Sequence, residues 1–288
     1  MDTPELDQKQ NITELKSKLI PLYLNSTILY LAAFLVVHIS AQLLACITAE
    51  CLFDIPTIFH HLKIICNIPD ILGVHFWTVK AILGFYSVVP IFCFILCFFL
   101  IRSLIKNKSK QRNLYKLFTL WCYIHAMNLI FGALIVGIPI MKGFGFVPGY
   151  LYIPKPTENF LIIISILLLI GNGIFLNRQF GNLAYNNNIL IEKYTHILFK
   201  LVLVLMPYIT VSLIFFIFGL PDDTTYENLL LLTTLLQIIP IIPFAMISER
   251  RNLQTKLIEK VSRPSLYFLG SLVLLLIIFI IYINLILH

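Results

Sequence analysis

Residues 81–101 read AILGFYSVVPIFCFILCFFLI, a run of 21 residues without a charged side chain. A helix of this length rises about 30 Å, the thickness of the hydrocarbon core of a bilayer. Such a run is typical of a transmembrane helix. Similar apolar runs predict spans at 27–49, 117–141, 159–177, 197–219, 228–247 and 266–287. We therefore expect an all-α integral membrane protein with about seven transmembrane helices.

The composition of the whole chain agrees with this expectation. Of 288 residues, 59% are hydrophobic and 12% are charged, whereas a soluble domain has about 25% charged residues. So few charges cannot cover a water-facing surface, which excludes soluble enzymes, nucleic-acid-binding modules and disordered chains. We divide the chain into a cytoplasmic N-terminal segment, 1–18, and a single polytopic transmembrane domain, 19–288. Because 159–177 is the shortest span and contains Gly171, Asn172 and Gly173, six spans plus a re-entrant segment is the alternative.

The basic residues divide unevenly between the two sides of these spans. Seventeen of the 21 Lys and Arg residues lie on the side of the N-terminus, and only Lys63, Lys80, Lys142 and Lys155 lie on the other side. Acidic residues divide evenly between the sides. Since short cytoplasmic loops are enriched in Lys and Arg, we expect the N-terminus inside and the C-terminus outside. The net charge of +7 is then an orientation signal, and we assign the protein to a bacterial inner membrane.

The loop after the first span is too apolar to lie in water. We predict that Ile55–Asn67 forms a short amphipathic helix in the membrane surface. In an oxidising periplasm, Cys51 and Cys66 could form a disulfide. Their spacing alone does not fix the geometry of such a bond, so the pairing stays open.

Polar side chains inside apolar helices are the main functional signal, because burying them in lipid is costly. His38 and Gln42 lie one helical turn apart in the first span, His125 and Asn128 lie three residues apart in the third, and Gln237 lies in the sixth. Counted from the predicted inner ends, His38, His125 and Gln237 have similar depths. We therefore predict that these five residues form one polar cluster.

Several functions compete for this cluster with a purely structural role. His38 and His125 are weak candidates for ligands of a transition metal or a haem iron, as in a metal- or haem-dependent enzyme. The cluster could instead line the cavity of a carrier or small-ligand-binding protein. We favour hydrogen bonds that fix helix packing, because the sequence predicts no buried Asp, Glu or Arg beside the cluster. We therefore assign no catalytic residue and no cofactor, and leave zinc and haem open.

One stretch, VVHISAQLLACITAECLFDIP from Val36 to Pro56, resembles the active-site helix of site-2-protease-type intramembrane metalloproteases. In that family the helix carries His-Glu-x-x-His, in which the histidines bind zinc and the glutamate is the general base. His38 matches the first histidine, but Ile39 replaces the glutamate and Gln42 replaces the second histidine. The resemblance thus implies a degenerate relative that binds membrane segments rather than cleaving them.

The sequence therefore predicts a multi-pass membrane protein without an evident catalytic apparatus. We expect the protein to lie in the lipid bilayer and to bind no nucleic acid. If the resemblance to site-2 proteases reflects kinship, we also expect a membrane-protein partner. A carrier or small-ligand binder with a mid-membrane cavity is the alternative.

Overall fold

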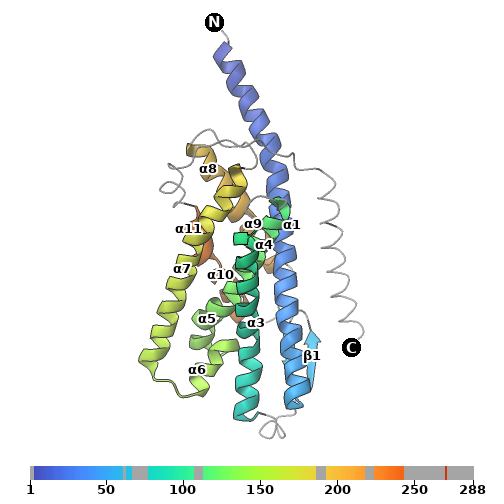
Figure 1. The fold of residues 1–288 in the computed structure, drawn as a ribbon, viewed down its shortest axis with the longest axis vertical. Helices are drawn as coiled ribbons and strands as arrows, with labels where there is room; N and C mark the ends of the chain where they lie inside the picture. The colour runs from blue at the N-terminus through green and yellow to red at the C-terminus, as the bar shows by residue number, and fades with distance from the viewer. Residues whose placement is uncertain are drawn as a thin grey trace.

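The computed structural model describes residues 3–60, 63–66, 77–106, 113–185, 193–217, 224–242 and 270. Over these residues the chain is almost entirely helical, and successive long helices run antiparallel in a bundle (Figure 1). The predicted seventh span, 266–287, lies outside the described residues except for Gly270, as does the end of the predicted sixth span.

Five helical stretches of the described chain are long and apolar enough to cross a membrane, as expected of a multi-pass membrane protein. They are Leu19–Phe53, Val79–Ile105, Leu114–Ile140, Lys155–Gly181 and Ile197–Ile217. Each coincides with one of the first five predicted spans, and a shorter apolar stretch, Thr225–Ile241, coincides with the sixth. The total of seven spans stays a prediction.

Some stretches are single helices and others change their hydrogen-bonding pattern along the way. The continuous helices are α1 (Thr3–Phe53), α3 (Val79–Lys106) and α7 (Lys155–Tyr185). A π-helix interrupts each of two other stretches. The third stretch consists of α4 (Asn113–Met127), the π-helix η1 (Asn128–Gly132) and α5 (Ala133–Ile140). The fifth consists of α8 (Lys193–Lys200), the π-helix η3 (Leu201–Leu205) and α9 (Met206–Ile217). The remaining elements are η2 (Gly143–Gly145), α6 (Phe146–Tyr150), α10 (Thr224–Thr233) and α11 (Leu235–Ile241).

The predicted amphipathic helix at Ile55–Asn67 is wrong, because this segment contains an antiparallel hairpin. Strand β1 (Thr57–His60) pairs with β2 (Lys63–Cys66), and Thr57 lies opposite Cys66. The strands read TIFH and KIIC, and such β-branched and aromatic residues favour strands. Pro56 also disfavours a helical conformation of the residue before it. The segment therefore folds as a small sheet against the end of α1.

The predicted alternative of a re-entrant fourth segment is also wrong, because α7 is one continuous helix of 31 residues. One of its glycines, Gly173, allows a close helix contact. A Cβ atom at Gly173 would overlap the backbone carbonyl of Gln237 in α11. Small residues let two membrane helices approach closely, so the Gly-Asn-Gly sequence marks a crossing point and not a break.

A proline in α9 creates a carbonyl that another helix must satisfy. Pro207 has no N–H, so it cannot donate the α-helical hydrogen bond to the carbonyl of Leu203, four residues earlier. Ser26 of α1 donates a hydrogen bond to this carbonyl at 2.6 Å. The indole N–H of Trp121 in turn donates to Ser26 Oγ at 3.1 Å. Hydrogen bonds between buried polar groups thus connect three helical stretches.

The ends of the bundle separate the charged segments in the way that the loop charges predict. The Lys106 end of α3, the Tyr185 end of α7 and helix α8 lie at the end from which α1 projects (Figure 1). The β-hairpin, α6 and the beginning of α7 lie at the opposite end, which also holds the four lysines assigned to the outside. The orientation in a membrane, and the bacterial inner membrane as its location, stay predictions.

One basic residue counted among the inner loops is instead fully buried. Lys200 has an exposed fraction of 0% and donates a hydrogen bond to Asn177 Oδ1 of α7. The sequence places Lys200 at the start of an apolar run, where a snorkelling side chain is expected. In the fold it contributes to the contact between α7 and α8.

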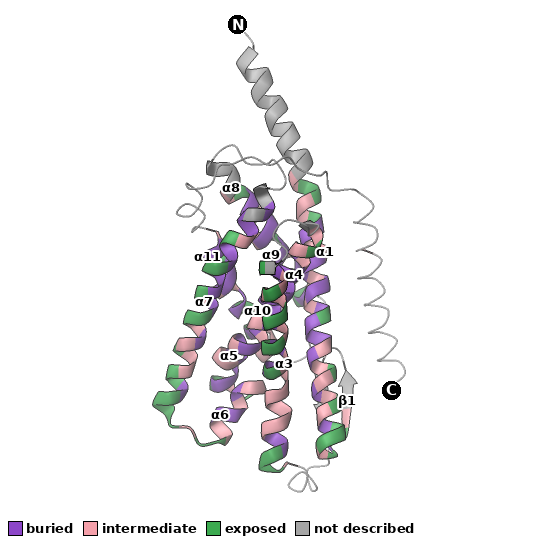
Figure 2. Ribbon diagram, in the orientation of Figure 1, coloured by how far each residue is buried: buried purple, intermediate pink, exposed green. Residues whose placement is uncertain are grey.

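Burial separates the helices into inner and outer ones. Buried residues gather where α1, α4 and α11 meet the other helices, whereas α3 and α7 carry many exposed residues (Figure 2). On α3, Phe94, Phe98 and Phe99 are each at least 60% exposed. In a bilayer such side chains face lipid tails, which are as apolar as they are.

The crossing at Gly173 can be tested with two alanine substitutions in α7. Gly173→Ala should destabilise the protein by about 1–3 kcal/mol through overpacking, which lowers the unfolding midpoint by roughly 2–10 °C. Gly171→Ala is the matched control, because a Cβ there meets no described atom within 4 Å. Thermal unfolding in detergent should leave the control unchanged or slightly more stable, and equal effects of the two substitutions would contradict the close approach.

Candidate functional site

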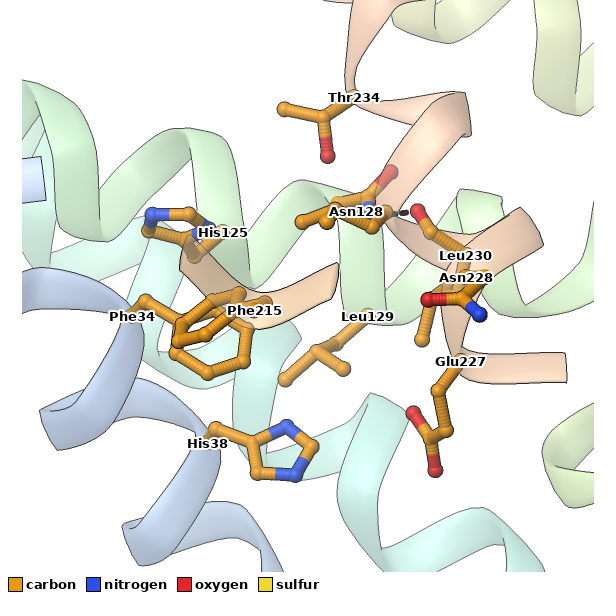
Figure 3. A pocket seen from close by; sticks show the side chains of 11 residues that line it. Phe34, His38, His125, Asn128, Leu129, Phe215, Glu227, Asn228, Leu230 and Thr234 are labelled. Atoms are coloured by element: carbon orange, nitrogen blue, oxygen red, sulfur yellow. Dashed lines mark hydrogen bonds between the residues drawn. The ribbon is translucent and has the colours of Figure 1, made fainter. Parts of the chain in front are cut away.

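A small cavity lies between α1, the third and fifth helical stretches and α10 (Figure 3). Its volume is about 30 Å³, enough for about two water molecules. The residues that line it are Phe34, His38, His125, Asn128, Leu129, Phe215, Glu227, Asn228, Leu230, Leu231 and Thr234. Three of the five residues predicted to cluster, His38, His125 and Asn128, therefore do meet around one cavity.

The two histidines contact the same phenylalanine. The ring of Phe34 stacks on His38 with centroids 5.2 Å apart and meets His125 edge-on at 5.5 Å. Phe215 packs against Phe34 at 4.7 Å, and Figure 3 shows this pair of rings between the two imidazoles. The histidines thus share a cavity, but an aromatic ring lies between them.

The hydrogen bonds of His125 define which of its nitrogens is an acceptor. The imidazole donates a hydrogen bond to the backbone carbonyl of Tyr30, whereas its Nε2 is buried and has no partner among the described residues. In a neutral imidazole the nitrogen that does not carry the proton is an acceptor. The Oγ1 of Thr234, which also lines the cavity, is likewise buried without a described partner. Two wall groups are therefore available to a ligand.

Asn128 links the third helical stretch to α10. Its Nδ2 donates to the carbonyl of Leu230 at 2.7 Å, and Thr233 Oγ1 lies 2.7 Å both from Asn128 Oδ1 and from that carbonyl. The Leu230 carbonyl is available because the N–H of Thr234 bonds Leu231 instead, at 3.1 Å. A Cβ at Gly132 would lie 2.5 Å from both Asn128 Oδ1 and Thr233 Oγ1, so glycine permits this contact.

Gln237 is not part of the cavity, contrary to the predicted cluster. It is fully buried, and its Oε1 accepts a hydrogen bond from Asn172 Nδ2 at 2.6 Å. Its Nε2 donates to the carbonyl of Ile124, four residues before the π-helix η1 begins, at 3.2 Å. The hydrogen bonds of Gln237 therefore connect α11 to α7 and α4. Fixing the packing of helices is the structural role that the sequence analysis favoured for the polar residues.

Gln42 also does not line the cavity. It lies one turn beyond His38 on α1 and is half-buried. In the stretch that resembles the protease helix, only His38 therefore reaches the polar cavity, and Ile39 is buried among apolar neighbours.

The cavity also contains a carboxylate that the sequence did not lead us to expect. Glu227 of α10 lines it together with Asn228, and Figure 3 shows the carboxylate on the same side of the cavity as His38. Glu227 lies one residue before the predicted span 228–247, so it was counted as a loop residue. Its spacing from Leu230, Leu231 and Thr234 is that of one helix face, which was the available signal.

The metal and haem hypotheses gain no ligand set from this arrangement. Among the residues that the structure describes, no group of three His, Cys, Asp or Glu side chains is placed to hold a metal ion. His38 and His125 remain weak candidates, with Phe34 between them. Zinc and haem stay untested.

The fold and the cavity together define a class: a helical multi-pass membrane protein with a small cavity inside the bundle, which has a mostly apolar wall and a few polar side chains. Comparison of the chain with protein-family models, with curated proteins and with solved structures found no match. The resemblance to site-2 proteases is therefore neither supported nor contradicted, and function must be argued from the site.

The packing role of Gln237 can be tested by a double-mutant cycle with Asn172. We expect Asn172→Leu and Gln237→Met to be coupled by about 0.5–1.7 kcal/mol, the range measured for hydrogen bonds between membrane helices. The measurement is the free energy of unfolding of the wild type, both single variants and the double variant. For comparison, Asn172→Leu combined with Tyr23→Phe, which removes a separate bond to Thr210, should be additive. Additivity of the first pair would contradict the assigned bond.

Proposed function

We propose that this protein is a membrane carrier or binder of a small monovalent cation that donates hydrogen bonds, such as ammonium. The observation that supports this function is that four polar side chains, His38, His125, Asn128 and Glu227, meet at one small cavity inside an apolar bundle. Ionisable groups within membrane helices are costly and usually mark a ligand or ion path.

The charge and hydrogen-bonding character of the cavity favours a cationic donor. Glu227 contributes a carboxylate, while His125 Nε2 and Thr234 Oγ1 are acceptors without a described partner. The rings of Phe34 and Phe215 form an aromatic wall beside these groups. Together these groups are suited to a ligand with several N–H or O–H donors and a positive charge.

The size of the cavity limits the ligand. A volume of about 30 Å³ suits a species no larger than about two water molecules. Organic substrates of ordinary size need several hundred Å³. Ammonium and hydronium meet this limit and carry the required donors, whereas a bulky organic cation does not fit.

Ligand-dependent stability of the purified protein tests binding. Saturating ammonium chloride should stabilise the folded state by about 2.7 kcal/mol at a hundredfold excess over Kd, which raises the unfolding midpoint by roughly 5–10 °C. N-methylglucamine chloride at equal concentration controls for ionic strength and should leave the midpoint unchanged. An equal rise with both salts would argue against a specific site.

Three variants identify the cavity as the place of binding. Glu227→Gln should abolish the ammonium-dependent increment, and Thr234→Val, which removes one acceptor at nearly constant volume, should reduce it. Glu158→Gln is the matched control, because this carboxylate pairs with Lys155 at 2.7 Å at the beginning of α7. Loss of the increment in Glu158→Gln, or its persistence in Glu227→Gln, would contradict the proposal.

Currents on solid-supported membranes separate a carrier from a binder. A concentration jump from N-methylglucamine chloride to ammonium chloride should give a transient current in wild-type proteoliposomes and not in Glu227→Gln proteoliposomes. A stabilising effect without a current would identify a binding protein without transport.

A further inference from the structure

We propose that Cys46 and Cys66 form a disulfide that fixes the β-hairpin to the end of α1. The sequence alone suggested Cys51 as the partner of Cys66. The geometry instead favours Cys46. All three thiols are free in the structure.

The side chain of Thr57 brings the two cysteines together. Cys46 Sγ lies 2.6 Å from Thr57 Oγ1, and Thr57 is the direct partner of Cys66 in the hairpin. Side chains of directly opposed residues in an antiparallel pair have Cβ atoms about 4.5–5.5 Å apart. Cys46 of α1 therefore contacts Thr57, and Cys66 of β2 lies directly opposite the same threonine.

Cys51 lies on a different face of α1. Cys46 and Glu50 are one turn apart, and both contact Thr57, since Thr57 Oγ1 also donates to Glu50 Oε1 at 2.7 Å. Cys51 is five residues after Cys46, which rotates it well away from this face, and it is exposed. A bond from Cys51 to Cys66 would therefore require the hairpin to move around the helix.

The environment of Cys66 favours an uncharged sulfur. Burial, and secondarily the nearby Cys46, raise the pKa of the Cys66 thiol to about 11. The thiolate is disfavoured there because the site is poorly solvated. A disulfide carries no charge, so the same burial does not oppose it. Cys46 is half-buried in the same contact.

The bond can form by thiol–disulfide exchange with a small disulfide such as oxidised glutathione. The thiolate of one cysteine attacks the oxidant, which releases one glutathione thiolate and leaves a mixed disulfide. The second cysteine then attacks the protein sulfur of that mixed disulfide and releases the second glutathione. Two protein thiols are oxidised to one disulfide, and one oxidised glutathione is reduced to two glutathione thiols, which take up the two protons that the protein loses. The predicted orientation places the hairpin outside, where such oxidants persist.

Peptide mapping of the full-length protein tests the pairing. The membrane-embedded protein is incubated with oxidised glutathione, alkylated, and cleaved after Lys and Glu under non-reducing conditions. Cleavage after Glu50 separates Cys46 from Cys51, and cleavage after Lys63 separates both from Cys66. We expect the Cys46–Cys66 linked peptide to exceed the Cys51–Cys66 peptide by at least roughly tenfold, since the folded chain holds the first pair at high effective concentration.

Serine substitutions provide the controls and keep the test independent of folding defects. Cys51→Ser should still form the bond, whereas Cys46→Ser and Cys66→Ser should each lose it and leave the other thiol open to alkylation. Linkage of Cys51 to Cys66 in the wild type, or unlinked Cys46 and Cys66 under conditions that oxidise exposed thiols, would overturn the proposal.

Discussion

The bundle depends on hydrogen bonds that cross between helices to backbone carbonyls without their usual helical donors. In an apolar environment no water satisfies such a carbonyl, and each unsatisfied group costs several kcal/mol. Ser26 satisfies Leu203, and Asn128 satisfies Leu230. In each case an irregular helix faces a polar side chain of another helix. The irregular helical segments and the polar side chains thus pair with each other, and this pairing determines which helix faces are in contact.

The same requirement explains where the cavity forms. Asn128 begins the π-helix η1, and Thr234 lies at the junction between α10 and α11. At these positions the chain departs from regular α-helical spacing. The space that remains is lined by His125 and Glu227 in addition to these two residues. π-Helical segments are frequent at functional sites.

Much of the fold was predictable from the sequence, because long uncharged runs identify membrane helices with little ambiguity. Part of the site was predictable as well: His38, His125 and Asn128 were recognised as polar residues in apolar helices. Glu227 was missed because hydropathy marks the apolar part of a helix and not its polar first turn. Gln237 was misplaced because depth along a helix does not specify the face on which a residue lies. The hairpin was missed since a short apolar loop has no clear periodicity.

Helix α1 has a further consequence for how the protein fits its bilayer. Its apolar stretch Leu19–Phe53 comprises 35 residues and is about 50 Å long, whereas the hydrocarbon core measures about 30 Å. A helix of this length fits such a core only if it tilts or if its ends extend beyond the hydrocarbon region. Because α1 carries His38, a change in bilayer thickness acts on the same helix that forms one wall of the cavity.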